Sequence, residues 1–347
     1  MSIPVYPPKP VAGDRVAVLS PSFAGPAVFP RPHELGLERL VKEFGLEPVE
    51  YPSTRRAATP RERAADIHAA FADPAVKAVF STIGGDDQIT VLPHLDRELI
   101  RANPKPFFGM SDNTSLLMYL WNTGIVGYHG GTVMTVLGRP GAVHPFSADS
   151  LRAALFGSQE YELRPAPEFR TIDQDWREAD TWTTEPPMEP GTGWGWHQAD
   201  RVVEGVSWGG CLEILAWQLM ADSEVQRDPA AYEGCVLMLE TSEELPPATE
   251  VFRTLRNMGE RGLLARFPAL LMGRPKTWSF ERPLDAGARA RYAAEQREAV
   301  LRATAAYAPE AMVVFDVDFG HTDPQLVLPY GGTVRVDGPA RRVSVRY

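Results

Sequence analysis

The chain has 347 residues, of which 44% are hydrophobic and 23% charged, as in ordinary globular proteins. Its 35 lysines and arginines against 45 aspartates and glutamates give a formal charge of −10, which argues against nucleic acid as a partner. No apolar run reaches the about 20 residues that span a membrane, and residues 1–10 lack the features of a signal peptide. Two cysteines are too few for a disulfide framework or a cysteine-based metal site. We therefore expect a cytoplasmic protein of about two domains that binds neither a membrane nor nucleic acid.

Residues 1–160 alternate apolar runs with amphipathic segments. The apolar runs predict strands over 15–20, 76–83 and 106–110. The segments between and after them predict helices over 33–44, 61–71, 89–100, 113–122 and 147–156. The helix over 61–71 has the clearest start, with Thr59 as its cap and Glu62 in its first turn. Strands that alternate with helices indicate a parallel sheet, so we expect an N-terminal α/β domain of flavodoxin- or Rossmann-like type.

Between residues 161 and 206 this alternation is lost. Prolines at positions 165, 167, 186, 187 and 190 are expected to break any regular element. Five of the eight tryptophans lie in this segment or just after it, namely Trp176, Trp182, Trp194, Trp196 and Trp208. We interpret residues 161–200 as a linker whose aromatic side chains either pack between two domains or stack on a planar ligand.

A second globular unit is expected over residues 201–347. Helices are predicted over 211–221, 247–258 and 286–306. Strands are predicted over 234–240, 269–272, 312–319, 325–328, 333–336 and 342–347. This order of elements predicts a C-terminal α+β domain with a β-rich, swivelling or barrel-like core.

The segment 107–114 places Ser111 between an apolar strand and a helix. Such a turn presents a serine hydroxyl above a sheet, and the backbone N–H that follows faces a developing oxyanion. The usual G-x-S-x-G pattern is incomplete, because Asn113 stands at the position of the second glycine. On the pattern alone, Ser111 fits either a nucleophile or an ordinary helix N-cap.

A nucleophilic serine needs a base, and the base needs an orienting group. His129 lies in Gly-Tyr-His-Gly-Gly close behind the serine helix, whereas His321 opens a loop after an apolar strand. The residue patterns alone leave these two histidines nearly tied. Glu240 ends another apolar strand, where a carboxylate can orient an imidazole, while Glu243 and Glu244 fit the cap of the next helix.

Gly84 and Gly85 form a further turn after a strand, and Asp86 and Asp87 follow them. Glycines let backbone N–H groups approach a ligand closely. A plain turn followed by an aspartate that caps a helix explains the same residues, and it is the simpler interpretation of this pattern alone.

Six segments in chain order carry a resemblance to a known family. They are Ser20–Ser22, Ile83–Asp87, Gly109–Thr114, Gly209–Gly210, Leu239–Glu243 and Phe319–Thr322. Along nearly the whole chain these segments resemble the LD-carboxypeptidase family of serine peptidases, and most of all its branch with the microcin C self-immunity peptidase. Each segment is a weak signal by itself, but six in order at compatible separations are a strong one.

The resemblance implies a catalytic triad that falls on Ser111, Glu240 and His321, in a cleft between the two domains. Ser111 would attack a carbonyl carbon, His321 would transfer its proton to the leaving amine, and Glu240 would hold the imidazole. The backbone N–H groups of Gly85 and Asp112 would bind the oxyanion. Such enzymes need no metal or cofactor.

The resemblance also implies a small-molecule substrate, and the branches of the family differ in it. Members of the cell-wall branch release the terminal D-amino acid of muramyl tetrapeptides, and they tend to carry Arg-Gly-Gly-Tyr-Gly where this chain has Ile-Gly-Gly-Asp-Asp. The microcin branch cleaves the amide between an aminoacyl group and a nucleotide analogue, resembles the Asp-Asp version, and has a tryptophan-rich loop. On this basis the substrate is expected to contact Gly84, Asp86, Trp182, Trp194 and Trp196.

Three hypotheses follow for the function. The first is a hydrolase of microcin C-like aminoacyl nucleotides, the second a muropeptide LD-carboxypeptidase, and the third a catalytically silent protein that binds a small ligand. The resemblance further implies a homodimer and gives His129 a structural role beside the site.

Overall fold

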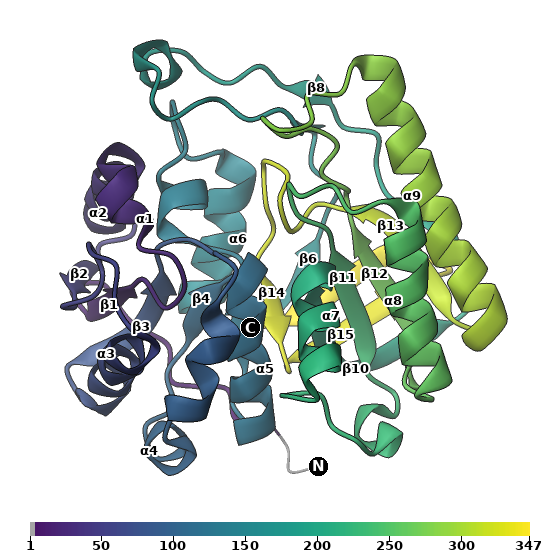
Figure 1. Cartoon of the computed structure of the whole chain (residues 1–347), viewed down its shortest axis with the longest axis horizontal. Coiled ribbons are helices and arrows are strands. Elements are labelled where there is room, and N and C mark those ends of the chain that lie inside the picture. Colours follow the sequence, from purple (N-terminus) through teal and green to yellow (C-terminus); the bar gives the residue numbers. More distant parts are fainter. Residues whose placement is uncertain (1–3) are drawn as a thin grey trace.

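The computed structural model describes residues 4–347, which form two large β-sheets with helices packed around them (Figure 1). The first sheet has the strand order β14-β5-β4-β3-β1-β2. Its strands are β1 (Arg15–Leu19), β2 (Glu47–Glu50), β3 (Val76–Ser81), β4 (Phe107–Gly109), β5 (Gly127–His129) and β14 (Leu328–Tyr330). Strands β1 to β5 run parallel, whereas β14 runs antiparallel to β5. The predicted parallel sheet of the N-terminal region is confirmed, and a strand from near the other end of the chain completes it.

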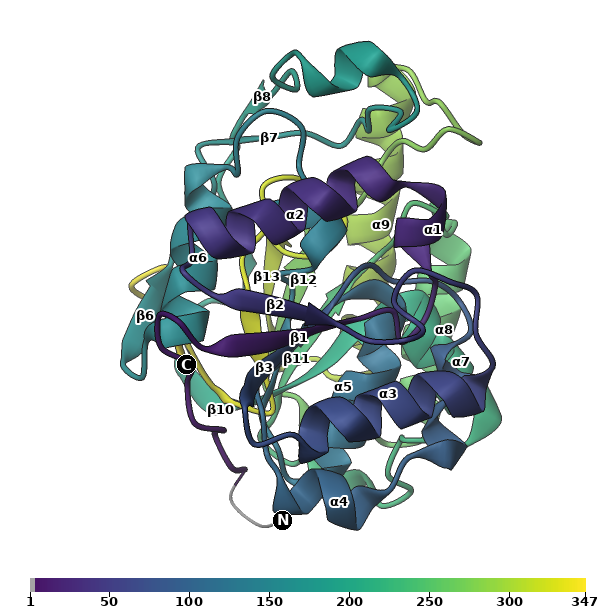
Figure 2. The same ribbon diagram turned by 90° about the vertical axis from the view of Figure 1, so that its left-hand side faces the viewer.

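Helices cover both faces of this sheet. Helix α2 (Pro30–Lys42) lies along one face and α3 (Pro60–Ala72) along the other (Figure 2). The other helices of this half are α1 (Gly25–Val28), α4 (Arg97–Ala102), α5 (Thr114–Thr123) and α6 (Pro145–Phe156). Helix α3 begins as its sequence predicts, because the Thr59 hydroxyl accepts a hydrogen bond from the Glu62 backbone and the Glu62 carboxylate accepts one from the Thr59 backbone.

The second sheet has the strand order β6-β16-β15-β10-β11-β12-β13-β9. Its strands are β6 (Glu160–Leu163), β9 (Gly195–His197), β10 (Val202–Cys211), β11 (Val236–Glu240), β12 (Ala269–Gly273), β13 (Met312–Val317), β15 (Thr333–Asp337) and β16 (Arg342–Arg346). Strands β10 to β13 are parallel and the others pair in antiparallel fashion. The predicted β-rich character of the C-terminal region is confirmed.

Three helices belong to this second half, namely α7 (Leu212–Ala221), α8 (Ala248–Glu260) and α9 (Ala286–Tyr307). Helices α8 and α9 lie side by side (Figure 1). A small two-stranded sheet, β7 (Glu168–Phe169) and β8 (Glu189–Pro190), lies at the top of the molecule in Figure 2. Of the helices within residues 4–347, none combines the length and the apolar character needed to cross a membrane.

Several expectations about single elements are wrong. The helix predicted over 89–100 is instead two 3-10 turns, Gln88–Thr90 and Leu92–His94, followed by α4. Pro93 has no backbone N–H and cannot sit inside a continuous α-helix, which explains the break. The strand predicted over 325–328 begins only at Leu328, and as β14 it joins the first sheet rather than the second.

The segment between residues 161 and 206 also contains regular structure that was not expected. Strand β6 pairs with β16, and β9 pairs with β13, so both ends of the segment extend the second sheet. Strands β2 and β5 of the first sheet were not predicted either. All four strands have only three or four residues, too few for hydrophobic alternation to show, and each is held by hydrogen bonds to a partner distant in sequence.

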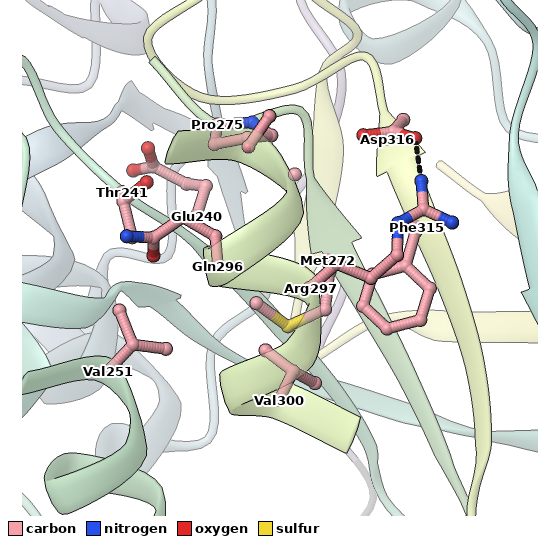
Figure 3. Close-up of a pocket in the computed structure, with 12 residues that line it drawn as sticks. Glu240, Thr241, Val251, Met272, Pro275, Gln296, Arg297, Val300, Phe315 and Asp316 are labelled. Carbon is pink, nitrogen blue, oxygen red and sulfur yellow. Dashed lines mark hydrogen bonds and ion pairs between the residues drawn. The ribbon is translucent and has the colours of Figure 1, made fainter. Parts of the chain in front are cut away.

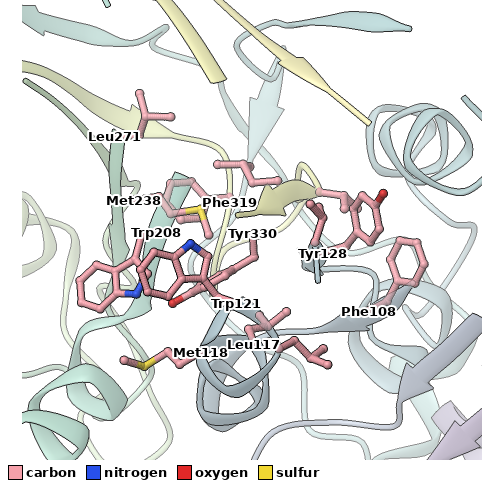
Figure 4. Close-up of a cluster of buried hydrophobic side chains, with 14 of the residues drawn as sticks. Phe108, Leu117, Met118, Trp121, Tyr128, Trp208, Met238, Leu271, Phe319 and Tyr330 are labelled. Carbon is pink, nitrogen blue, oxygen red and sulfur yellow. The ribbon is translucent and has the colours of Figure 1, made fainter. Parts of the chain in front are cut away.

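Helix α5, which follows Ser111, lies between the two sheets. All of its residues except Asn122 are buried. The ring of Trp121 stacks on Tyr232 at 5.5 Å between centroids and lies 6.4 Å from that of Trp208 on β10 (Figure 4). The apolar sequence of α5 is therefore explained by burial on both sides, and the helix is a rigid support for the turn that precedes it.

Close packing between the two halves depends on a glycine. Gly210 has a φ of +106°, and a Cβ atom on it would lie 2.6 Å from the Thr114 hydroxyl oxygen. The neighbouring backbone N–H of Cys211 donates a hydrogen bond of 3.0 Å to that same oxygen. Because Cys211 is opposite Glu240 in the pairing of β10 with β11, this contact brings the start of α5 beside the end of β11.

Substitution of Gly210 tests this packing. We expect Gly210→Ala to lower the free energy of unfolding by about 3 kcal/mol, because backbone strain and the clash with Thr114 act together. Gly234→Ala is the matched control, since Gly234 also has a positive φ but open space around it, and it should cost about 1 kcal/mol. Urea unfolding followed by circular dichroism measures both, and equal losses would contradict the close approach.

Candidate active site

Ser111 lies at the sharp turn between β4 and α5. Met110 is extended, with φ −145° and ψ −177°, and Ser111 then takes a φ of +60° before a 3-10 turn that ends at Asn113. A positive φ is strained for a residue with a side chain, and such strain is often found at active sites. Asn113 occupies the N-cap position of α5, so Ser111 does not serve as that cap. The predicted strand–turn–helix is present around the serine.

Hydrogen bonds tie this turn to the glycine turn after β3. The Asn113 side-chain amide donates to the Ile83 carbonyl at 3.1 Å, and the Asn113 side-chain oxygen accepts from the Gln88 side chain at 2.9 Å. The buried Asp112 carboxylate accepts hydrogen bonds from the Gln88 backbone at 2.8 Å and from the Ser22 hydroxyl. Burial raises the pKa of Asp112, although these two donors oppose the change. The polar residues beside Ser111 therefore hold the two turns together.

Gly84 and Gly85 allow the two turns to approach each other. A Cβ atom on Gly84 would lie 2.7 Å from the Ser111 Cβ and 2.8 Å from its Oγ, and a Cβ on Gly85 would clash with the Ser22 hydroxyl. Within residues 4–347, the backbone N–H groups of Gly85 and Asp112 donate no hydrogen bond. Asp86 follows Gly85 and is exposed.

Glu240 and His321 form a hydrogen-bonded pair where the parallel strands of the second sheet end. The Nδ1 atom of His321 lies 2.6 Å from Oε2 of Glu240, the last residue of β11. The other carboxylate oxygen, Oε1, lies 3.6 Å from Nε2 of His129 at the end of β5. Burial alone would raise the pKa of Glu240, but the two histidines lower it below the usual range. Burial alone would lower the pKa of His321, but Glu240 raises it above the usual range.

Glu240 is almost fully buried in a largely apolar part of the second half. It borders a hollow between the sheet and helices α8 and α9, which Figure 3 shows. Val251, Met272, Val300 and Phe315 contribute apolar side chains to this hollow. Only 1% of Glu240 is exposed, so the imidazoles rather than water stabilise its charge.

Two aspartates anchor the loop that carries His321. Asp318, which is fully buried, accepts hydrogen bonds from the Trp194 indole N–H at 2.9 Å and from Arg274 at 3.2 Å. Asp323 lies 2.9 Å from Arg139 and 2.7 Å from Arg170. The loop is thus fixed on both sides of the histidine. Neither anchor was predicted from the sequence, although acidic residues at short distances on either side of a candidate histidine were a visible signal.

Further carboxylates lie near the histidine. Glu243 Oε2 is 3.4 Å from His321 Nε2, and among the described residues no hydrogen bond joins that nitrogen to Ser111. Glu213 is buried at the start of α7 and accepts hydrogen bonds from the Ser242 backbone at 2.9 Å and hydroxyl at 2.6 Å. Burial and the charge of Glu243 raise the pKa of Glu244.

The expectation that Glu243 and Glu244 cap α8 is wrong. Helix α8 begins at Ala248, and Pro247 occupies its N-cap position. Two consecutive prolines, Pro246 and Pro247, keep the chain extended after Leu245, so the glutamates are left in the loop beside His321.

The three tryptophans expected to contact substrate are half-buried and lie in different places. The Trp194 indole is hydrogen-bonded to Asp318, and this places it beside the His321 loop. Trp196 is on β9, where the Arg341 guanidinium lies 5.4 Å from its ring centroid. Trp182 donates a hydrogen bond to the Trp176 carbonyl and lies 5.0 Å from the Arg31 guanidinium on α2. Their contact with a ligand stays a prediction.

The chain is similar in sequence and in fold to known proteins. Residues 16–130 match the N-terminal domain of LD-carboxypeptidases, and residues 204–336 match the C-terminal domain of these enzymes. Together the two matches cover more than half of the chain. This protein therefore belongs to the LD-carboxypeptidase family, whose members are serine peptidases, as the sequence motifs predicted.

Individual relatives carry carboxypeptidase names. SCO6489 of Streptomyces coelicolor, named as a carboxypeptidase, is 30% identical over 97% of this chain and 97% of its own length. The microcin C7 self-immunity protein MccF of Escherichia coli is 25% identical over 84% of this chain and 79% of its own. A protein of Bacillus subtilis named as a murein peptide carboxypeptidase is 35% identical, over 47% of this chain and 53% of its own.

Solved structures confirm the fold class. An MccF-like protein from Streptococcus pneumoniae in complex with AMP has a TM-score of 0.84 and 24% identity, and the match covers 96% of this chain and 99% of that one. MccF in complex with aspartyl sulfamoyl adenosine has a TM-score of 0.82 and 23% identity, with 99% of both chains covered.

The anchor of the His321 loop gives a prediction on stability. We expect Asp318→Asn to lower the free energy of unfolding by about 3 kcal/mol, because Arg274 is 6% exposed and is left without a compensating charge. Asp316→Asn is the control, since its ion pair with Arg297 is more exposed and should be worth less than about 1 kcal/mol. Urea unfolding compares the two variants, and an Asp318→Asn value as small as the control would show that the pair does not hold the loop.

The contact of Glu243 with His321 gives a second prediction. We expect Glu243→Gln to lower the pKa of His321, because one of the carboxylates that favour the imidazolium loses its charge. Nuclear magnetic resonance of the imidazole during a pH titration measures this without any substrate. Glu298→Gln removes the same charge from an exposed position on α9 and should leave the titration unchanged. A rise, or no change, in the Glu243→Gln protein would contradict the contact.

Proposed function

We propose that this protein hydrolyses an amide bond in small aminoacyl-nucleotide compounds, with Ser111 as nucleophile, His321 as general base and Glu240 as the group that orients the base. The observation that carries the proposal is the 2.6 Å hydrogen bond between buried Glu240 and Nδ1 of His321. It leaves Nε2 as the nitrogen that exchanges protons with a serine hydroxyl.

The reaction follows from these positions. As Ser111 Oγ attacks the carbonyl carbon, its proton passes to Nε2 of His321, and the imidazolium that forms is stabilised by Glu240. The tetrahedral intermediate breaks its carbon–nitrogen bond, and His321 returns the proton to the leaving amine. A water molecule then gives a proton to His321 and attacks the ester carbonyl on Ser111. The bond between the carbonyl carbon and Ser111 Oγ breaks, His321 returns the proton to Oγ, and the acid is released. The triad is regenerated without any other reactant.

Backbone groups supply the site for the negative oxygen. The N–H groups of Gly85 and Asp112 have no partner in the described chain, and both belong to turns that meet at Ser111. Donors held in this way before the reaction begins are effective, because they need little reorganisation as charge develops.

Nucleotide binding is supported by the solved relatives and by the aromatic segment. Related structures hold AMP or aspartyl sulfamoyl adenosine. We assign base stacking to Trp194, which is partly buried and lies beside the His321 loop, whereas Trp182 and Trp196 lie elsewhere and are assigned to other contacts with the ligand. We assign further substrate contacts to Gly84 and to the exposed Asp86 beside it.

A second candidate function is the release of a terminal D-amino acid from muramyl peptides. The relative named as a murein peptide carboxypeptidase supports it with 35% identity over 47% of this chain, against 25% over 84% for the microcin protein. The same triad would perform this reaction, so the two candidates differ only in how the substrate is held.

A direct assay distinguishes the candidates. The purified protein is offered aspartyl sulfamoyl adenosine in one reaction and an L,D-muramyl tetrapeptide in another, and mass spectrometry follows the products. We expect cleavage of the adenosine compound, and a loss of at least about 10⁴-fold in rate for Ser111→Ala. Ser158→Ala, at an exposed serine, should retain full activity.

Each other outcome has a clear meaning. If D-alanine is released and the adenosine compound is not cleaved, the protein is a carboxypeptidase of muramyl peptides, which is the second candidate function. If the Ser111→Ala variant still hydrolyses the substrate, Ser111 is not the nucleophile. If neither compound reacts but one of them binds, the protein is a silent binding protein and the proposal is wrong.

A further inference from the structure

Glu240 faces two buried imidazoles, and the proposed mechanism uses only one of them. His321 is hydrogen-bonded to Oε2, whereas Nε2 of His129 lies 3.6 Å from Oε1. His129 is fully buried, and neither of its ring nitrogens has a hydrogen-bond partner within residues 4–347. Oε1 of Glu240 has no partner either. A buried donor and a buried acceptor thus face each other slightly beyond hydrogen-bond distance.

His129 belongs to the first sheet, whereas Glu240 belongs to the second. Its backbone pairs with Gly109 of β4, two residues before Ser111, and with Leu328 of β14. The ring is packed edge-on against Phe319, with 5.6 Å between the ring centroids. His129 is therefore fixed to the sheet that carries the nucleophile, while its side chain points to the carboxylate of the other sheet.

We infer that His129 is a positioning residue, which donates a hydrogen bond from Nε2 to Oε1 of Glu240 and so aligns the two halves of the site. The inference rests on the proposed function. Hydrogen bonds in unliganded active sites are often long and shorten when the substrate is bound. A movement of about half an ångström between the sheets brings this pair within the usual distance. Glu240 then has one donor on each oxygen and cannot rotate away from His321.

The alternative is that His129 only fills space. A space-filling residue can be replaced by one of similar volume, whereas a donor can be replaced only by another donor. His129→Met keeps much of the volume without an N–H, and His129→Gln keeps a side-chain N–H. His33→Gln is the matched control, because His33 is also fully buried and pairs with the carboxylate of Glu50 at 2.8 Å, on α2 and β2.

The test uses a fluorophosphonate, which reacts with an activated serine by phosphorus–oxygen bond formation and loss of fluoride, and therefore does not depend on the natural substrate. We expect Ser111 labelling to slow by about tenfold or more in His129→Met, and to stay within about threefold of wild type in His129→Gln and His33→Gln. In His129→Met the pKa of His321 should also rise, because Glu240 then shares its charge with His321 alone; Glu243 and Glu213 are the other carboxylates that act on His321. Equal labelling in the Met and wild-type proteins, or equal slowing in the Met and Gln variants, would overturn the inference.

A measurement on the unmodified protein keeps the inference testable if a variant fails to fold. Nitrogen chemical shifts of the His129 ring should show the proton on Nε2, and a proton on Nδ1 alone would overturn the donor role. Failure of the proposed function has a different signature. In that case wild-type Ser111 is not labelled, or the label survives in Ser111→Ala, whatever the ring of His129 shows.

Discussion

A carboxylate that has lost its water keeps its charge only if other groups stabilise it, and Glu240 meets this condition through histidines on two sides. Most features of the site depend on this requirement. His321 has to lie at the end of the sheet where Glu240 emerges, so its loop needs the anchors at Asp318 and Asp323. The two sheets must also meet closely enough for His129 to reach the same carboxylate. The charge of one buried side chain thus explains the position of both the His321 loop and the end of β5, which carries His129.

The part of the site around Ser111 relies on backbone geometry more than on charge. Ser111 is held in a strained conformation by an amide and a carboxylate that bind the neighbouring glycine turn, and by a helix with almost no exposed residue. These contacts all lie within the half of the molecule built on the first sheet, although they join residues 24 to 90 apart in the sequence. Glu240 ends a strand of the other sheet, so the position of Ser111 relative to the pair of Glu240 and His321 is set where the two halves touch, at Thr114, Gly210 and Cys211.

Local signals in the sequence were enough for the main elements, and they failed where distant parts of the chain decide the outcome. The helix at Pro60 and the turn at Ser111 were predictable because caps, prolines and glycines act on their neighbours. The choice between His129 and His321 was not predictable from local signals, because it depends on how each imidazole meets Glu240 in the folded chain. The family resemblance was needed to make that choice. The structure shows that both histidines face that carboxylate. Strand β9 was missed for the same reason, since its hydrogen-bond partner β13 lies more than a hundred residues away.

The place of β14 also has a consequence for the order in which the protein becomes complete during synthesis. Residues 328–330 form the strand beside β5, so an early part of the chain waits for one of the last parts to cover its edge. A ribosome that has released the first sheet has not yet made His321 or the strand that flanks His129. Until the C-terminal part of the chain has been made, the first sheet lacks the strand at this edge, and the Ser111 turn lacks the loop that carries His321. The dependence is one-sided, because the first sheet needs β14 at its edge whereas every strand of the second sheet comes from residues 160–346.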